Sequence, residues 1–342
     1  MDIRNLYQLG VEKFDVGPPA QKILARIIAG DENSQDFENA IIDDAFFTEQ
    51  IILEGSRLLK SGPVKSLSHA ISLIGPQRAT YFILGHSIAR IFNPDSDRNF
   101  KNIATAGSKI QRSRESESLA KSLDCPFSGT AFAAGFVFDI FEEWLNSNVL
   151  IKDNFATLFE KTWLHSKRTA ALAWSFTGNK KLDLPLQKLL FSTGLIHDVG
   201  RLLLAFTYPE KYKDIMIKHS YLKTRYPYDD GFEVELEQAA FQYSHPEAGS
   251  LLLWQMEVLK DWEAAVEYHH DFGFLEIRDS RLNQIEICLR IADQIACLLD
   301  TTEQVPEAIA QEIIEPYAKN FPVSPREIKD LVVTLRANRT LL

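Results

Sequence analysis

The spacing of the apolar residues constrains the fold more than any other feature of the sequence. Along almost the whole chain, apolar residues recur at intervals of three and four, which places them on one face of an α-helix. No segment shows a convincing alternation of apolar and polar residues, the pattern of a half-buried β-strand. We therefore predict an all-α fold, a multi-helix bundle with an N-terminal helical lobe.

Prolines and capping residues indicate where several helices begin. The two prolines at 18–19 precede an apolar run, and proline suits a first helical turn because amides there have no partner within the helix. Ser244 and Glu247 have the spacing of a capping box, in which the serine oxygen accepts from an early amide and the glutamate reaches back. This places His245 in the first turn of a helix. The same pattern at 324–327 predicts the start of the C-terminal helix.

A polar stretch at residues 93–102 separates two apolar parts of the chain. Before it, residues 36–59 and 66–92 each have helical periodicity. We place a lobe boundary here, with an N-terminal helical lobe at residues 1–95 and a helical core at residues 96–342. The length of 342 residues suits one large domain or two ordinary ones.

Charge and cysteine content narrow the class of protein. The net charge of −10 argues against nucleic-acid binding, which normally requires a basic excess or stripe. The three cysteines, Cys125, Cys288 and Cys297, lack metal-type or redox-type spacing, so we expect them to be reduced. The first residues lack the apolar core of a signal peptide, and no apolar run approaches the ~18 residues of a membrane span. We therefore expect a cytoplasmic protein without membrane contact.

The segment GLIHDVGRLL at 194–203 places an imidazole and a carboxylate side by side among apolar residues. We predict a helix that starts after Asp183 and Pro185 and runs through His197 and Asp198. Burying such polar groups costs several kcal/mol unless they are paired or bind a metal ion. Other polar side chains should therefore face this pair.

Several polar residues have positions from which they could pair with His197 and Asp198. His165, His269 and Asp293 fall on or beside the apolar stripes of their predicted helices. Each of them alone is more often an ordinary hydrogen-bonded residue. Together with His245 and the buried pair, however, they form a set of imidazoles and carboxylates, the ligands that zinc, iron and manganese take in proteins. Three other histidines have no partner that the sequence suggests, and we interpret them as structural: His69, His86 and His219.

The chain also contains a weak internal similarity. Residues 131–141, AFAAGFVFDIF, align with residues 190–200, LFSTGLIHDVG. The earlier segment keeps the glycine and the aspartate, as Gly135 and Asp139, but has Phe138 in place of the histidine. A duplicated hairpin that kept its packing and lost its metal ligand would give this pattern, and so would chance similarity between two helices.

The order of these residues, H…HD…H…HH…D, resembles the HD superfamily, whose helical core holds metal between these positions. The HDOD branch, the HD-related output domains of bacterial signalling proteins, is the most similar, on the stretches HDVGR, YSHPEAGSLLLWQM and VEYHH. The segments GPPAQKILARII, IIDDAFFTEQIIL and SLSHAISLIGPQR are similar to the helices that precede the core in that branch. The resemblance covers nearly the whole chain. It implies an HD-like bundle with an inserted or duplicated hairpin at about residues 101–160.

The resemblance also implies a ligand set, all of which this chain retains. Asp198 would bridge two ions. One ion would be completed by His165, His197 and Asp293, and the other by His245, His269 and His270. We expect one or two ions of Fe, Mn or Zn and no organic cofactor.

Two functions fit this ligand set. The first, which we favour, is a regulatory module that binds a signalling protein or a small phosphorylated ligand without catalysis. The second is a metal-dependent phosphohydrolase acting on a nucleotide or cyclic dinucleotide, since the ligands also resemble those of HD-GYP phosphodiesterases. Against the second, Arg201 replaces the lysine of that family, although it could still contact a phosphate, and DFGF at 271–274 replaces its Gly-Tyr-Pro. No general base is obvious, and the oligomeric state stays open.

Overall fold

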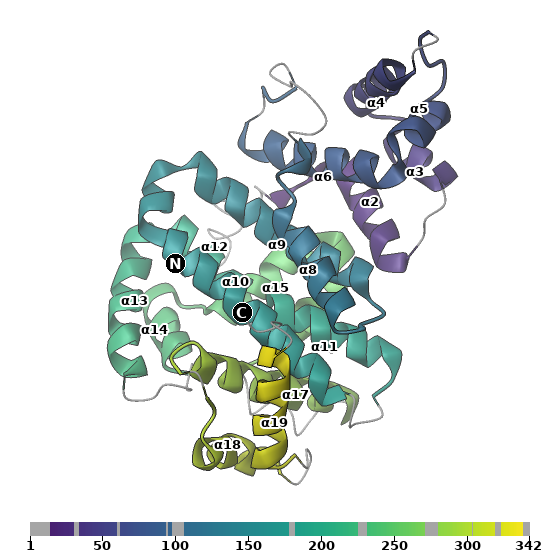
Figure 1. Cartoon of the computed structure of the whole chain (residues 1–342). Helices are drawn as coiled ribbons and strands as arrows, with labels where there is room; N and C mark the ends of the chain where they lie inside the picture. The colour runs from purple at the N-terminus through teal and green to yellow at the C-terminus, as the bar shows by residue number, and fades with distance from the viewer. Residues whose placement is uncertain are drawn as a thin grey trace.

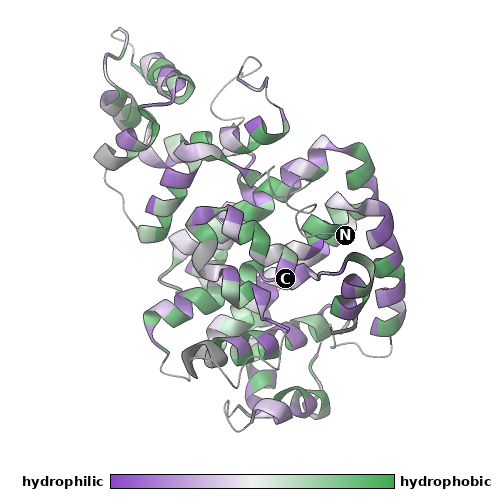
Figure 2. Ribbon diagram, turned by 180° about the vertical axis from the view of Figure 1, so that it is seen from behind, coloured by the Kyte–Doolittle hydropathy of each residue, from purple (hydrophilic) through white to green (hydrophobic). Residues whose placement is uncertain are grey.

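A computed structural model describes residues 14–30, 34–59, 62–93, 95–97, 106–177, 182–224, 231–270, 280–302, 304–318 and 323–337. Within these residues the regular elements are α-helices and short 3-10 helices, with no strand, which confirms the predicted all-α class. Figure 2 shows apolar and polar residues alternating around many of the outer helices, as the periodicity predicts.

The segment that we predicted as the N-terminal lobe, residues 1–95, contains five described helices: α2 (Gly17–Ala29), α3 (Ser34–Ile41), α4 (Ala45–Leu58), α5 (Leu67–Ile74) and α6 (Pro76–Phe92). It lies at the upper right of Figure 1. The prolines begin α2 as predicted. Each of the two following segments, however, forms two helices instead of one. Asp44 breaks the first by capping α4, where its side chain accepts from the Phe47 amide at 3.0 Å. Gly75 breaks the second with a φ of 89°, which favours glycine.

The segment that we predicted as the helical core, residues 96–342, is described in part. Its described α-helices are α8 (Gln111–Ser122), α9 (Ser128–Ser147), α10 (Val149–Thr177), α11 (Leu184–Ile196), α12 (Val199–Thr207), α13 (Pro209–Lys223), α14 (Gly231–Phe241), α15 (His245–Gln255), α16 (Glu263–Glu267), α17 (Ser280–Leu299), α18 (Glu307–Ile314) and α19 (Pro325–Ala337). Two 3-10 helices complete it, η2 (Glu257–Trp262) and η3 (Glu315–Tyr317). The capping boxes predicted before α15 and α19 are both present.

Helix α9 is the central element of the molecule. All residues from Ala131 to Phe141 are buried, so this helix is surrounded by protein on every side rather than along one stripe. It contacts α2 and α6 of the N-terminal lobe as well as α8, α10, α11 and α12 of the core. One apolar cluster therefore runs from the N-terminal lobe into the core, while a second cluster lies around α17, α18 and α19.

The predicted lobe boundary is only partly described, because residues 94 and 98–105 lie outside the described ranges. Its described part folds back onto α6. There Asp97 accepts from the guanidinium of Arg90 at 2.9 and 3.0 Å, and it lies 2.7 Å from His86 Nε2. His86, which had no partner in the sequence, therefore pairs with the start of the polar stretch.

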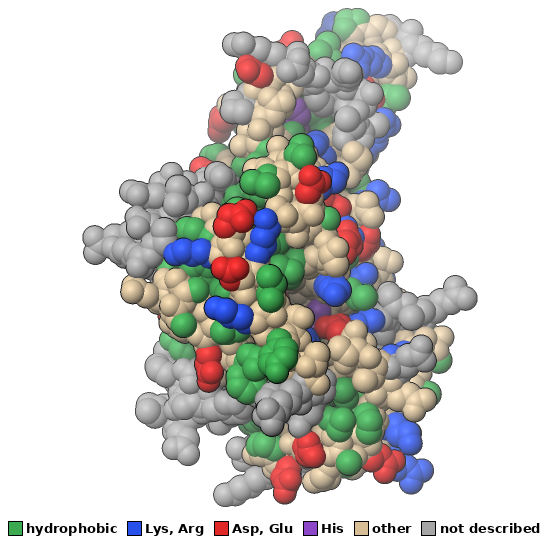
Figure 3. All heavy atoms as spheres, turned by 90° about the vertical axis from the view of Figure 1, so that its left-hand side faces the viewer, with side chains coloured by type: hydrophobic (Ala, Val, Ile, Leu, Met, Phe, Trp, Pro, Cys, Tyr) green, Lys and Arg blue, Asp and Glu red, His purple; other side chains and the backbone are tan. Residues whose placement is uncertain are grey.

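One stretch is long and apolar enough to cross a membrane, whereas we expected no such stretch. Leu184–Thr207, which joins α11 and α12, reaches a mean hydropathy of 1.4 over an 18-residue window. In the structure 94% of that window is buried inside the protein. The apolar composition is therefore accounted for by packing in the core. On the face seen in Figure 3, basic and acidic side chains are interspersed.

Candidate metal centre

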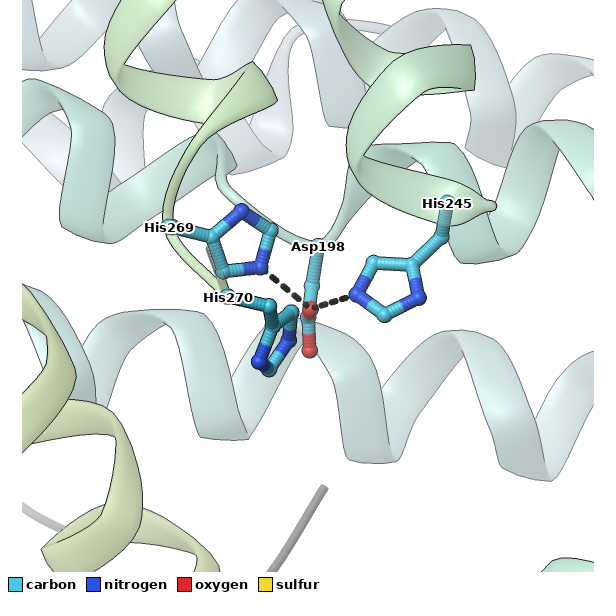
Figure 4. A group of neighbouring side chains, drawn as sticks. All are labelled: Asp198, His245, His269 and His270. Carbon is cyan, nitrogen blue, oxygen red and sulfur yellow. Dashed lines mark ion pairs between the residues drawn. The ribbon is translucent and has the colours of Figure 1, made fainter. Parts of the chain in front are cut away.

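The chain bends at the buried pair instead of continuing as one helix. Helix α11 ends at Ile196 and α12 begins at Val199, so the predicted continuous helix is wrong at this point. The tight packing of α12 accompanies the bend. A Cβ at Gly200 would lie only 1.9 Å from the carbonyl oxygen of His245, so α12 can meet the start of α15 only with a glycine there. As a result, Asp198 projects from a bend toward the other histidines (Figure 4).

A second close approach brings α10 to the same place. A Cβ at Gly194 would lie 2.7 Å from the Cα of Ala170, so the backbones of α10 and α11 nearly touch. This crossing sets His165 of α10 beside His197, with 5.3 Å between their ring centroids. Both rings are buried.

One carboxylate oxygen of Asp198 faces several imidazoles. Its Oδ1 lies 3.4 Å from Nε2 of His245, 3.6 Å from Nε2 of His197 and 3.8 Å from Nε2 of His269. One nitrogen each of His245, His269 and His270 lies within 4.8 Å of the others and of an Asp198 oxygen. Figure 4 shows these three rings around the carboxylate.

The Nδ1 atoms of His197 and His269, which point away from Asp198, donate to backbone carbonyls. Nδ1 of His197 donates to the Gly194 carbonyl at 3.0 Å, and Nδ1 of His269 donates to the Val266 carbonyl at 2.6 Å. These bonds place the remaining lone pair on Nε2, the atom that faces Asp198. Burial also lowers the pKa of His269 to about 4, even though Asp198 opposes this shift. This ring is therefore neutral, as a metal ligand must be.

His245 is held by a buried glutamate on α14. Glu237 Oε2 accepts from both Nδ1 and the backbone amide of His245, each at 2.7 Å. The other oxygen of Glu237 accepts from the Tyr212 hydroxyl at 3.0 Å. A carboxylate that orients a histidine in this way is a common partner of metal-binding imidazoles.

Five buried atoms converge without a hydrogen-bond partner among the residues that the structure describes. They are Nε2 of His197, His245, His269 and His270, and Oδ1 of Asp198. Leaving a buried polar atom unsatisfied costs about 1–3 kcal/mol, so such a cluster requires an explanation. A cation with nitrogen and oxygen ligands could satisfy the atoms of Asp198, His245, His269 and His270, since these residues offer ligand atoms within 4.8 Å of one another, and Zn, Fe and Mn accept such ligands. The residues present therefore fit a metal ion.

His165 differs from these histidines because both of its nitrogens meet carboxylates. Nε2 donates to Asp293 Oδ1 at 2.8 Å and Nδ1 donates to Asp300 Oδ2 at 3.2 Å. Burial alone would lower the pKa of His165, but the two carboxylates outweigh it and raise the pKa to about 10. His165 and Asp293 therefore form a buried ion pair.

The second oxygen of Asp198 is occupied by an arginine. Arg201 donates to Asp198 Oδ2 at 2.6 Å and also donates to Glu233. Burial would raise the pKa of Asp198, but the charge of Arg201, together with the nearby histidines, holds that pKa well below its usual range. The carboxylate is thus ionised and ready to bind a cation.

The structure brings all seven predicted ligands to one place, from α10, the bend before α12, α15, the turn after α16, and α17. His269 and His270 lie in that turn and not on the predicted helix. Arg201, which we predicted as a possible phosphate contact, donates instead to the carboxylates of Asp198 and Glu233. The DFGF segment at 271–274 lies outside the described residues.

Sequence reasoning missed the residues that support the ligands. Asp300 lies seven residues after Asp293, and this heptad spacing could have revealed it. Glu233 and Glu237 share one face of α14 at a spacing of four. His219, interpreted as structural, lies 3.2 Å from Glu233 and so joins this network.

Part of the chain is similar to a known domain family. Residues 143–272 match the HDOD domain, and no curated protein matches the chain. A solved structure from Shewanella amazonensis SB2B, whose name suggests a phosphohydrolase, is 12% identical, with coverage of 98% of this chain and 96% of that chain and a TM-score of 0.48. An HDOD domain protein from Geobacter sulfurreducens is 15% identical (99% and 96% covered, TM-score 0.43). The MmoQ response regulator from Methylococcus capsulatus is 17% identical (92% and 95% covered, TM-score 0.38).

Proposed function

Because the chain carries an HDOD domain of the HD superfamily at residues 143–272, we propose that it is a signalling module that acts by binding rather than by catalysis. Its metal pocket would stabilise the core and report on a bound partner or small phosphorylated ligand. The ion would be Fe, Mn or Zn, held by imidazoles and by Asp198.

The observation that carries this proposal is the engagement of the two carboxylates that support the ligands, Glu237 and Asp300, while the imidazole nitrogens left without a partner are the ones that we assign to the ion. Glu237 is bound to His245 and Tyr212, and Asp300 to His165 and to Arg168, whose NH1 lies at 2.6 Å. A general base needs a carboxylate or imidazole free to take a proton from the reacting group. Among the described residues near the pocket, these carboxylates are instead saturated by fixed donors. This is the arrangement of a structural or sensing site.

A phosphohydrolase is the second candidate, and the retention of all seven HD-type ligands favours it. A bound ion would supply Lewis acidity toward a phosphoryl oxygen. Arg201 would contact the phosphate in that case, but its guanidinium already donates to Asp198 and Glu233.

Metal content and turnover test the proposal together. We expect protein purified without chelator to contain Fe, Mn or Zn by elemental analysis, and we expect Asp198→Asn to lower that content at least tenfold, since it removes the shared ligand. Asp139→Asn is the matched control, because Asp139 is equally buried but lies in α9, away from the histidines. Metal at background in the wild type would contradict the pocket.

Turnover distinguishes the two candidates. Wild-type protein loaded with Mn, Fe or Zn is incubated with cyclic dinucleotides, nucleoside phosphates and bis(p-nitrophenyl) phosphate. We expect no hydrolysis above the Asp198→Asn variant. Hydrolysis that the wild type and the Asp139→Asn control both show, and that Asp198→Asn abolishes, would establish the phosphohydrolase and overturn the regulatory proposal.

A further inference from the structure

The two oxygens of Asp198 face opposite charge environments. Oδ1 faces the unsatisfied Nε2 atoms of the histidines described above, and it accepts no hydrogen bond. Oδ2 lies 2.6 Å from the NH1 of Arg201. A carboxylate that bridges two metal ions gives one oxygen to each. In this chain, one of these oxygens is already neutralised by a protein cation.

The guanidinium of Arg201 is fixed where it lies. Its side chain is 9% exposed, and its second terminal nitrogen donates to Glu233. Glu233 is itself buried, accepts from the Tyr212 hydroxyl at 3.0 Å and lies 3.2 Å from His219. Because Arg201 follows Asp198 by three residues in the first turn of α12, the backbone also sets its position. Displacing Arg201 would leave Glu233 buried without its main partner, which is strongly unfavourable.

The ligands on the Oδ2 side are also engaged. His165 Nε2 lies 3.8 Å from Oδ2, but this nitrogen donates to Asp293 at 2.8 Å. Nδ1 of the same ring donates to Asp300. On the Oδ1 side, by contrast, the Nε2 atoms of the imidazoles have no hydrogen-bond partner within the described residues. His165 and Asp293 are therefore paired with each other, whereas the unsatisfied Nε2 atoms of His197, His245 and His269 face Oδ1.

We propose that Arg201 takes the place of a second metal ion, so that the centre binds one ion, on the Oδ1 side of Asp198, among His245, His269 and His270. This inference rests on the proposed metal pocket and deepens it. An arginine side chain keeps its charge at all accessible pH values, and like charges repel strongly when they are buried together. Two-metal clamping of a phosphoryl group is thereby excluded by a residue of the chain itself.

The number of bound ions tests this inference directly. The wild type is loaded with Mn(II) or Zn(II), desalted and measured by elemental analysis, and the Mn form is examined by electron paramagnetic resonance. We expect one ion per chain and the spectrum of an isolated Mn(II). The variant Arg201→Met/Glu233→Gln removes the cation and its buried partner together. We expect this variant to bind two ions and to show an exchange-coupled Mn pair.

A matched control changes another buried arginine. Arg112 has the same 7% residue exposure as Arg201 and also pairs with carboxylates, at 2.9 Å from Glu142 and 2.6 Å from Glu160. Arg112→Met/Glu142→Gln should still bind one ion. Arg201→Lys, which keeps the charge, should do the same.

Each outcome decides a separate point. Two ions or a coupled spectrum in the wild type would overturn the inference while leaving the pocket in place. One ion in the double variant would overturn it too, provided that circular dichroism shows native helix content. If that variant does not fold, Arg201→Gln, which keeps hydrogen-bonding capacity but loses the charge, must bind more than one ion per chain. No ion in the wild type would instead remove the proposed pocket itself.

Discussion

Two helical hairpins of this molecule, α8–α9 and α10–α11, share a close contact between their helices but differ in the surroundings of the aspartate that follows it. In each, a glycine on the second helix meets the backbone of the first. A Cβ at Gly135 would lie 2.5 Å from the carbonyl oxygen of Arg112, and a Cβ at Gly194 would lie 2.7 Å from the Cα of Ala170. In both hairpins an aspartate follows the glycine by four residues. This similarity supports the alignment of the two segments, whether it came from duplication or from convergent packing.

The two aspartates have different surroundings. Asp139 accepts from the amides of Arg112 and Ser113 at 2.7 and 3.0 Å, and from the Ser113 hydroxyl. Both its oxygens are therefore satisfied by the first turn of α8, whereas Asp198 keeps Oδ1 without a donor. The comparison teaches that burial of a carboxylate does not by itself indicate a metal ligand. The unsatisfied oxygen and the surrounding lone pairs do.

The residue before each aspartate also differs. Phe138 packs on the rings of Phe159 and Trp163, with centroids 6.2 and 4.8 Å away. His197, at the equivalent position, lies at a bend between helices and not inside a continuous one. In the α8–α9 hairpin an aromatic core thus occupies the position that an imidazole occupies at the pocket.

The largest expected effect comes from making the first hairpin resemble the second. Phe138→His puts a polar ring among aromatic side chains, so we expect it to lower the free energy of unfolding by about 2–4 kcal/mol. It should not raise the metal content, because no second imidazole faces that position in the described structure. Urea denaturation and elemental analysis measure both quantities. A gain of one bound ion would show that the difference between the hairpins lies in this residue alone.

Next in size are the two glycines at the helix crossings. Gly135→Ala and Gly194→Ala should each cost about 1–3 kcal/mol, since the new Cβ would overlap the backbone of the facing helix. Gly107→Ala is the control, because its Cβ would meet only the Tyr81 Cβ at 3.8 Å. Thermal unfolding compares the three variants. If Gly194→Ala melts with the wild type, the close approach of α10 and α11 is not required.

A smaller effect is expected from the glutamate that orients His245. Glu237→Gln keeps the size of the side chain but weakens its bond to Nδ1, so metal affinity should fall about 10–100-fold. Competition with a chelator measures this change. Glu142→Gln, which alters a carboxylate of the α9 helix, should leave the affinity unchanged. Equal affinities for wild type and Glu237→Gln would mean that His245 does not bind the ion.

The smallest expected effect is a difference in pH dependence, measured in chelator. Burial raises the pKa of Asp139 well above its usual range, although Ser113 opposes this, whereas Arg201 helps to hold the pKa of Asp198 well below it. A raised carboxyl pKa favours the native state at low pH, and this advantage is lost as pH rises through the folded pKa. The stability of Asp139→Asn relative to wild type should therefore increase from pH 4 to pH 7. A constant difference would contradict the shift.

For Asp198 the sign is opposite. A depressed pKa contributes stability above the unfolded pKa of about 3.9 and loses it only as pH falls toward the folded value. Asp198 itself should therefore contribute no slope to the difference between Asp198→Asn and wild type between pH 5 and pH 8 in chelator. A slope from His245, whose pKa the charge of Asp198 helps to raise, is removed by making the comparison in a His245→Gln background. A slope that persists there would contradict the depressed pKa of Asp198.

The fold class and the proximity of the seven candidate residues could be predicted from the sequence, because both follow from patterns that are local or ordered along the chain. The role of these residues as ligands stays a prediction. Helical periodicity revealed the bundle, and the position of His245 followed from its capping box. The bend at His197 could not be predicted, because it accompanies contact between Gly200 and a segment 45 residues later, His245. Glu237 was missed for the same reason, since its role depends on a hydrogen bond from His245, which lies on another helix.

An ion in this pocket would also act as a cross-link. Its ligands come from the bend at Asp198, from the start of α15 at His245 and from the turn at His269, so it would close chain loops that no covalent bond closes. None of the three cysteines forms a disulfide, and loop closure removes conformational entropy from the unfolded chain. Loss of the ion would therefore loosen the packing of α12, α15 and α16 together. Amide hydrogen exchange should then become faster in all three helices.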